Sequence, residues 1–274
     1  MPAHPVRLPT QDEIATFEAD GVVALKGVYQ SEWIDLLREG VDGAMTTSDR
    51  YSRRIENKGE APFFTDYITW KRVPQIERFV MEGPAAELGA ALMRSSKANF
   101  LFDGVFVKEP GSMKPSTWHQ DQPYYCVEGQ QVVVLWAPLD PCPATVSLQC
   151  VKGSHKWGKA FRPIKFQDGS DFGRAAADGY FDPPDVEADY ADSIVAYDLE
   201  PGDVIAFHGM TMHGAPGNPG PHRRRATNST WIGDDGRYIV RPGVMEPDFP
   251  ECRLNPGDPI DSAWFPRVFE AHPA

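Results

Sequence analysis

Two histidines, one aspartate and one arginine are spaced so that they could build an iron site. His119 and Asp121 stand two positions apart, and His213 and Arg224 follow far along the chain. Two imidazoles and one carboxylate on one side of iron(II) leave the opposite positions open for a co-substrate and O2. In a strand, residues two apart share a face, so the first pair can reach one metal. His213 follows the apolar run 203–208 and is expected to be the third ligand, and Arg224 is expected to bind a carboxylate nearby.

The segments around these residues resemble a known family. They read Thr117-Trp-His-Gln-Asp121, Val132-Val-Val-Leu-Trp136-Ala-Pro-Leu-Asp140, Gly153-Ser-His155, Thr211-Met-His-Gly-Ala-Pro-Gly-Asn218 and Arg223-Arg-Arg-Ala226. In this order they resemble the phytanoyl-CoA dioxygenase family of iron(II)/2-oxoglutarate oxygenases. The resemblance covers residues 10–235 and is sharpest from Val105 to Trp231.

The resemblance implies a metal-dependent oxidation. It implies that His119, Asp121 and His213 hold iron(II), and that 2-oxoglutarate and O2 are the co-substrates. The expected reaction is hydroxylation of an unactivated C–H bond of a small-molecule metabolite, with release of succinate and CO2. Zinc can bind the same three groups, so a zinc-dependent hydrolase or isomerase on a cupin-like barrel is one alternative. A jelly-roll protein that binds a ligand without catalysis is the other.

The co-substrate is expected to lie against cations and one tryptophan. The family's arginine stands eleven residues after the second histidine, before a basic residue and an alanine, and Arg224 matches this arrangement. Its planar guanidinium suits the distal carboxylate of 2-oxoglutarate. The resemblance also places Trp136 beside the co-substrate and a basic residue near Arg72. Lys71, next to Arg72, and Lys108 are the other candidates for this cation.

Other positions bear on the ligand set and the reaction. His208 is the rival to His213, but its five-residue offset changes its facing. His155 is expected to anchor a loop. Related halogenases carry a small residue in place of Asp121, so its presence here favours hydroxylation, with desaturation and ring closure left open. Ala215 departs from the family, which commonly has a serine there.

Composition restricts the class of protein. The chain has 274 residues, a formal net charge of −12 and 41% hydrophobic residues, which predicts one dioxygenase domain over 1–274. The acidic balance argues against nucleic acid as a partner. No apolar run reaches the roughly 20 residues of a membrane span, and the N-terminus lacks a secretion signal, so a cytoplasmic location is expected. Four cysteines without C-x-x-C spacing argue against a zinc or disulfide framework. Oligomeric state is not predicted.

Periodicity divides the chain into helical and β-rich parts. Residues 1–98 are expected to be mainly helical, with helices after Thr10, after Ser31 and over 84–94, a strand over 22–25 and an irregular stretch over 46–66. Residues 99–235 are expected to form a β-rich core with a long insert near 156–193, followed by an extension over 236–274. Strands are expected over 100–108, 132–137, 146–151, 194–199, 203–207 and 227–232. Such a pattern predicts a sandwich or barrel with helices on one face. The resemblance implies a double-stranded β-helix, or jelly roll, with the N-terminal helices on its outer face.

Overall fold

The computed structural model describes residues 3–55, 59–164, 179–241, 247–250 and 252–271. Its strands are β1 (Val22–Leu25), β2 (Arg53–Ile55), β3 (Phe63–Tyr67), β4 (Lys97–Lys108), β5 (Ser116–His119), β6 (Val127–Glu128), β7 (Val132–Pro138), β8 (Gln149–Val151), β9 (Ile194–Ala196), β10 (Val204–His208), β11 (His213–Ala215), β12 (Arg224–Ile232), β13 (Arg237–Tyr238) and β14 (Arg267–Glu270). Its helices are α1 (Gln11–Asp20), α2 (Ser31–Thr46), α3 (Pro74–Glu82), α4 (Ala85–Met93) and α5 (Val186–Asp189), with short 3-10 turns η1 (Thr69–Lys71), η2 (Gln122–Tyr124), η3 (Ser154–Lys156) and η5 (Ala191–Ser193).

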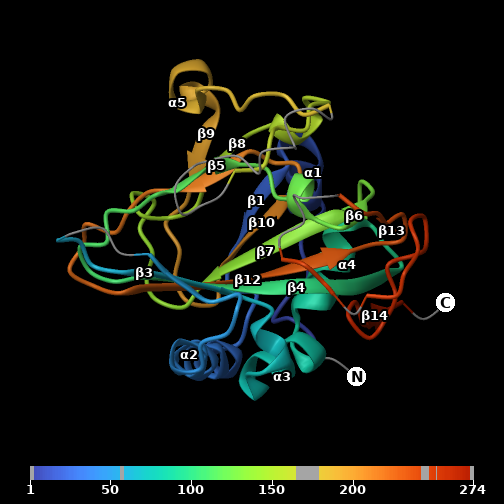
Figure 1. The fold of residues 1–274 in the computed structure, drawn as a ribbon, viewed down its shortest axis with the longest axis horizontal. Coiled ribbons are helices and arrows are strands. Elements are labelled where there is room, and N and C mark those ends of the chain that lie inside the picture. The colour runs from blue at the N-terminus through green and yellow to red at the C-terminus, as the bar shows by residue number, and fades with distance from the viewer. Residues whose placement is uncertain (1–2, 56–58, 165–178, 242–246, 251, 272–274) are drawn as a thin grey trace.

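Two antiparallel sheets make the core of the fold. The larger runs β1-β10-β7-β12-β4-β3-β2, with β14 also paired to β4, and the smaller runs β5-β11-β8-β9. Figure 1 shows the smaller sheet on one side of the larger one and the helices α2 and α3 on the other. The structure thus confirms the predicted double-stranded β-helix. It also confirms that helices lie on the outer face of this core.

Alternation along the larger sheet separates two hydrophobic cores, because successive side chains of a strand point to opposite faces. On β7, Val134 and Trp136 belong to the core between the sheets. Val133 and Leu135, from the same strand, belong to the core under the helices. The strand is buried on both faces, so its near-continuous apolar sequence follows from its central position.

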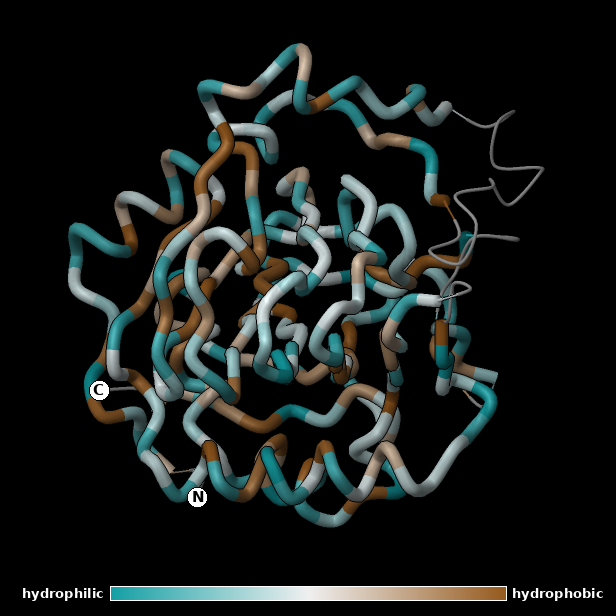
Figure 2. Tube along the Cα trace, turned by 90° about the vertical axis from the view of Figure 1, so that its left-hand side faces the viewer, coloured by the Kyte–Doolittle hydropathy of each residue, from teal (hydrophilic) through white to brown (hydrophobic). Residues whose placement is uncertain are grey.

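The helices cover the outer face of the larger sheet. α4 packs on β4, β7 and β12, with Leu88 and Leu92 fully buried. Its Gly89 allows a close approach to Trp231, since a Cβ there would lie 3.2 Å from that side chain. In the side view of Figure 2, hydrophobic and hydrophilic residues alternate along the helical layer. This alternation is expected of amphipathic helices lying on a sheet.

The N-terminal helix forms as its sequence predicts. The Thr10 hydroxyl accepts from the backbone of Glu13, and the Glu13 carboxylate accepts in turn from the backbone of Thr10, a complete capping box. Gly21 ends the helix with φ +72°, a conformation that favours glycine. The second helix differs slightly, because Gln30 is its N-cap and Ser31 is its first residue.

One N-terminal prediction is wrong. The stretch 46–66, expected to be irregular, contains β2 and β3, and both strands extend the larger sheet. β3 was missed because its residues are buried on both faces, which removes the alternation that marks a strand. α3 was not predicted either, although Pro74 stands in its first turn.

The insert near 156–193 crosses the limits of the described chain. Residues 165–178 within it lie outside the described residues. The described parts contain α5 and η5, and a bridge pairs Phe161 with Phe181. Within the described ranges, no helix has the length and apolar character that a membrane crossing requires.

Candidate active site

Two neighbouring strands of the smaller sheet bring the three predicted ligands together. β11 pairs with β5 so that His213 and His119 are direct partners. β5 ends at His119, and Asp121 takes helical backbone angles at the start of η2. The expectation that His119 and Asp121 share one strand face is therefore wrong. Instead, the backbone N–H groups of Asp121 and Gln122 both donate to the carbonyl of Gly209, which fixes the turn that returns the carboxylate to the site.

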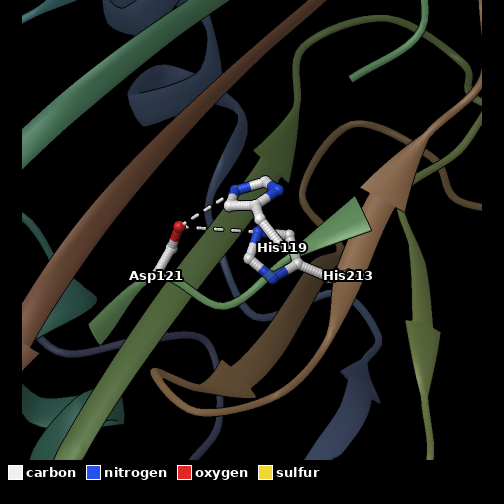
Figure 3. A group of neighbouring side chains, drawn as sticks. All are labelled: His119, Asp121 and His213. Carbon is white, nitrogen blue, oxygen red and sulfur yellow. Dashed lines mark ion pairs between the residues drawn. The ribbon is translucent and has the colours of Figure 1, made fainter. Parts of the chain in front are cut away.

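The three side chains converge on one point. Asp121 Oδ1 lies 3.2 Å from His119 Nε2 and 3.6 Å from His213 Nε2. Figure 3 shows both imidazoles directed at this carboxylate. Each residue offers one ligand atom within 4.8 Å of the other two. The donor set of two nitrogens and one oxygen is that of the facial triad that binds iron(II).

Backbone carbonyls set the tautomer of both histidines. His119 Nδ1 lies 2.7 Å from the carbonyl oxygen of Thr117, and His213 Nδ1 lies 2.9 Å from that of Thr211. A carbonyl oxygen only accepts, so each Nδ1 must carry a proton in the neutral ring. In this tautomer each Nε2 carries the lone pair that can bind a metal at the shared point. Such a second hydrogen bond is the usual way in which proteins orient a metal-binding imidazole.

The charges at the site also suit a cation. Burial lowers the pKa of His213 to about 4, and the neighbouring His119 contributes to the shift. Burial alone would raise the pKa of Asp121, but the facing imidazoles and the Tyr125 hydroxyl outweigh it, so that this pKa is lowered. At neutral pH, His213 is therefore neutral and Asp121 is ionised. Both are in the form that binds metal.

Arg224 points into the same cavity. It is the first residue of β12, is only 3% exposed and lines the cavity together with the three ligands. One terminal nitrogen donates to the carbonyl of Val146, whereas the buried Nε has no partner among the described residues. Burial lowers the pKa of Arg224. Its neighbours Arg223 and Arg225 form ion pairs with Glu109 and Asp140, and neither of them lines the cavity.

The other predicted co-substrate contacts divide into three cases. Trp136 lines the cavity. Lys108 is fully buried opposite Arg224 on the neighbouring strand, and its ammonium donates to the carbonyls of Pro216 (2.7 Å) and Ala215 (3.4 Å). Arg72 is not among the cavity-lining residues, because its guanidinium is bound to Asp66. The geometry gives the Arg72 prediction no support.

The remaining polar residues near the triad have structural partners. His208 is not part of the metal-binding group, and its ring bonds to the carbonyl of Gln130 and to the backbone N–H of Met210. His155 packs against Gly21 and lies 3.3 Å from the carbonyl of Glu18, so it anchors η3 to the end of α1. Gln120 joins the loop after η3 to the turn before β11 through Lys159 and Met210.

The cavity is larger than the predicted residues suggest. Its empty space, measured out to solvent at the mouth, is about 940 Å³. Tyr124 and Tyr125 line it, together with residues that the sequence did not single out: Phe63, Thr65, Tyr67, Phe102, Phe106 and Asn228. All six come from β3, β4 and β12 at alternating positions. Because β3 was read as irregular, this alternation was not recognised as a cavity wall.

A comparison with protein families gives one match. Residues 17–226 match the model of the family described as phytanoyl-CoA dioxygenase. That range contains the whole candidate site. A search among curated proteins found no match.

Solved structures of similar fold cover nearly the whole chain. The epimerase SnoN of nogalamycin biosynthesis, in complex with Fe3+, alpha ketoglutarate and nogalamycin RO, has a TM-score of 0.74 at 18% identity over 94% of this chain and 98% of its own. The carbocyclase SnoK of the same biosynthesis has a TM-score of 0.73 at 18% identity over 98% and 99%. EctD from S. alaskensis, with 2-oxoglutarate and 5-hydroxyectoine, has a TM-score of 0.66 at 18% identity over 97% and 88%. At such identities the likeness establishes the fold alone.

Proposed function

Because the chain belongs to the phytanoyl-CoA dioxygenase family, whose iron- and 2-oxoglutarate-dependent chemistry the donor set fits, we propose that it hydroxylates an unactivated C–H bond of a small-molecule metabolite and releases succinate and CO2. The observation that carries this proposal is the convergence of His119 Nε2, Asp121 Oδ1 and His213 Nε2 in a cavity that Arg224 also lines. Bound iron(II) would supply the activation of O2 that such an oxidation needs.

Arg224 has the features of a co-substrate anchor. It is a fixed cation whose buried Nε has no partner in the described structure, and an unsatisfied buried donor costs about 1–3 kcal/mol. A carboxylate that accepts two parallel hydrogen bonds from the guanidinium would remove that cost. We assign the distal carboxylate of 2-oxoglutarate to Arg224. Trp136 is assigned to the wall beside the co-substrate.

Lys108 supports this anchor from behind. Its ammonium group lies beside Arg224 and holds the backbone after β11 through two carbonyls. Once protonated on co-substrate binding, it would add positive charge near the proposed carboxylate without being a lining residue. The serine that the family commonly places after its second histidine is Ala215 here, so its hydrogen bond must come from another group. Lys108 is the nearby candidate.

The cavity wall is assigned to the substrate. Aromatic side chains around the triad keep water away and hold the substrate so that one C–H bond faces the metal. Hydroxylation is the proposed outcome because Asp121 is present. SnoN is an epimerase and SnoK a carbocyclase, so enzymes of this fold also catalyse other reactions.

Product analysis tests the proposal. Iron(II)-loaded protein is incubated in air with 2-oxoglutarate and a library of small organic compounds, and succinate is measured together with the mass of each compound. We expect succinate release to depend on iron, O2 and 2-oxoglutarate and to rise with the true substrate, whose product gains one oxygen atom. A product that loses two hydrogens, or keeps its mass, would replace hydroxylation by desaturation or ring closure, or by epimerisation. Activity with zinc that ignores 2-oxoglutarate would contradict the enzyme class itself.

A further inference from the structure

A large part of the cavity stays unassigned once the metal and the co-substrate are placed. The cavity opens to solvent at its mouth, and most of its lining residues belong neither to the triad nor to the co-substrate anchor. The unassigned wall is mainly aromatic, formed by Phe63, Tyr67, Phe102, Phe106, Tyr124 and Tyr125. What this wall can recognise follows from its rigidity, its charge and its few polar atoms.

The aromatic wall is braced by its own rings. Tyr67 packs edge-to-face on Phe102 and Phe106, with centroids 6.2 Å and 6.0 Å apart. Phe102 packs in the same way on Tyr125 at 5.1 Å. Tyr124 is fixed from outside the cavity, because its hydroxyl bonds to both backbone groups of Ile164. Rings held in this way offer a preformed apolar surface to a flat ligand.

The described wall offers no charge to a substrate. Apart from its tyrosines, its ionisable lining residues are His119, Asp121 and His213, which are assigned to the metal, and Arg224, which is assigned to the co-substrate. A charged substrate group would lose its water here without gaining a counter-ion among the described residues. Such an unpaired buried charge is strongly unfavourable. The wall therefore favours a neutral substrate.

The polar lining residues include Thr65, Ser116 and Asn228, and the buried Oδ1 of Asn228 has no hydrogen-bond partner among the described residues. Its direct partner on β4 is Gly104, where a Cβ would lie 2.6 Å from that oxygen and 2.9 Å from the Phe106 ring. A glycine within a strand often marks a close approach of this kind. The strand thus makes room for an amide whose acceptor is left free.

We propose, on the basis of the function proposed above, that the substrate is a neutral, flat aromatic or polycyclic molecule whose hydroxyl group donates a hydrogen bond to Asn228. Its rings lie against the aromatic wall, and Asn228 sets which of its edges faces the metal. Amino acids, phosphonates and acyl-CoA esters are excluded as substrates by this proposal because all carry charge.

Matched probes test the proposal by equilibrium binding. Isothermal titration calorimetry under nitrogen, on protein loaded with iron(II) and 2-oxoglutarate, compares 2-naphthol, 2-methoxynaphthalene and 2-naphthoate. We expect 2-naphthol to bind best. The methoxy compound, which has no donor, should bind roughly fivefold to tenfold more weakly, as one buried hydrogen bond implies. The anionic 2-naphthoate should bind at least about tenfold more weakly than 2-naphthol.

Three variants assign the hydrogen bond to Asn228. Asn228→Leu should remove the preference for naphthol over its methyl ether, and Gly104→Ala, which crowds the same amide, should reduce it. Thr227→Val changes the neighbouring residue, which borders a different pocket from the active site, and should keep the preference. Circular dichroism and thermal unfolding verify that each variant is folded. If Asn228→Leu does not fold, Gly104→Ala decides the assignment.

The result separates this inference from the proposed function. 2-Naphthoate binding as tightly as 2-naphthol, an unchanged preference in the folded amide variants, or no binding of any probe to protein that binds 2-oxoglutarate would overturn the substrate proposal. Selective naphthol binding by protein that fails to bind 2-oxoglutarate would support the substrate class and count against the oxygenase function alone.

Discussion

At the scale of single residues, the site depends on groups that are held in one chemical form before any ligand arrives. Carbonyls of Thr117 and Thr211 fix the histidine tautomers, and burial keeps His213 neutral. Arg224 is buried, and within the described part of the chain its Nε has no acceptor. The sequence was sufficient to find the triad and Arg224, because residue type and spacing specify them. It was not sufficient for Asn228, whose free amide depends on a glycine of another strand.

Replacing Arg224 tests its assignment to the co-substrate. Arg224→Met should raise the KM for 2-oxoglutarate in succinate formation by roughly 10- to 100-fold, because charge-assisted hydrogen bonds are worth about 1.5–3 kcal/mol. Arg225→Met is the matched control, since that guanidinium is held by Asp140 outside the cavity. An equal rise in KM in both variants would show that overall positive charge, and not a specific bond from Arg224 to one carboxylate, determines the affinity for 2-oxoglutarate.

Lys108 should couple co-substrate binding to proton uptake. Burial, with a smaller contribution from the charge of Arg224, lowers the pKa of Lys108 to about 6. The groups that face it are Arg224, the Phe63 ring and the carbonyls of Ala215 and Pro216. At pH 7.5 the free protein therefore holds a neutral amine, and a bound dicarboxylate would raise its pKa and bring in a proton.

The sign of the pH dependence follows from this shift. Above pH 6, affinity for 2-oxoglutarate should fall as pH rises, because the proton that accompanies binding becomes scarcer. Calorimetry at pH 7.5 in buffers of different ionisation enthalpy should show net proton uptake in the wild type and much less in Lys108→Met. Proton release, or uptake that persists in the variant, would contradict the role of Lys108.

At the scale of elements, the site requires β5 and β11 to lie close together. Gly214 follows His213, and a Cβ there would lie 3.0 Å from the carbonyl oxygen of Ser116 and 3.3 Å from the Trp118 ring. Gly214→Ala should therefore push β11 away from β5 and weaken iron(II) binding by about tenfold, or 1.4 kcal/mol, in competition with a metal indicator.

The matched control is a glycine in a helix far from the site. Gly43→Ala in α2 meets only an ordinary contact at 3.6 Å with Val73. It should leave iron binding unchanged and stabilise the fold by up to about 1 kcal/mol, since alanine has the higher helix propensity. A Gly214→Ala protein with wild-type iron affinity would show that the spacing between β5 and β11 does not determine iron(II) binding.

Local sequence predicted some elements well and others poorly. The capping box at Thr10 located α1, and apolar runs located β7 and β10, because these signals are local. β3 was not predicted because both of its faces are buried, which removes the alternation of polar and apolar residues. Asp121 does not continue the strand of His119, because its backbone N–H donates to the carbonyl of Gly209. This contact spans 88 residues, and no local pattern encodes it.

At the scale of the whole molecule, the family resemblance predicted what periodicity could not. Short strands indicate a sandwich or barrel, but the strand order β1-β10-β7-β12-β4-β3-β2 joins distant segments. That order places β3 beside β4 and so creates the aromatic wall. The substrate cavity is thus a property of the topology, which explains why the sequence predicted the metal site and not the wall.

Metal removal should leave the fold intact. The two hydrophobic cores are built without the triad, unlike small domains that fold only around a metal. Chelation with EDTA should keep the far-ultraviolet circular dichroism spectrum unchanged. It should lower the free energy of unfolding only by the lost binding contribution, about 2.7 kcal/mol at a metal concentration 100 times Kd, and Tm should fall accordingly. Loss of the spectrum on chelation would mean that iron is part of the folding core.

The most direct test of the central claim is an anaerobic titration of iron(II)-loaded protein with 2-oxoglutarate, followed by visible absorption. We predict a saturable charge-transfer band that is lost in His213→Ala and kept in His208→Ala, a buried histidine bound to Gln130. In Arg224→Met the band should require much higher co-substrate. Folded, iron-bearing protein that shows no band, or a band that His213→Ala leaves unchanged, would contradict the account.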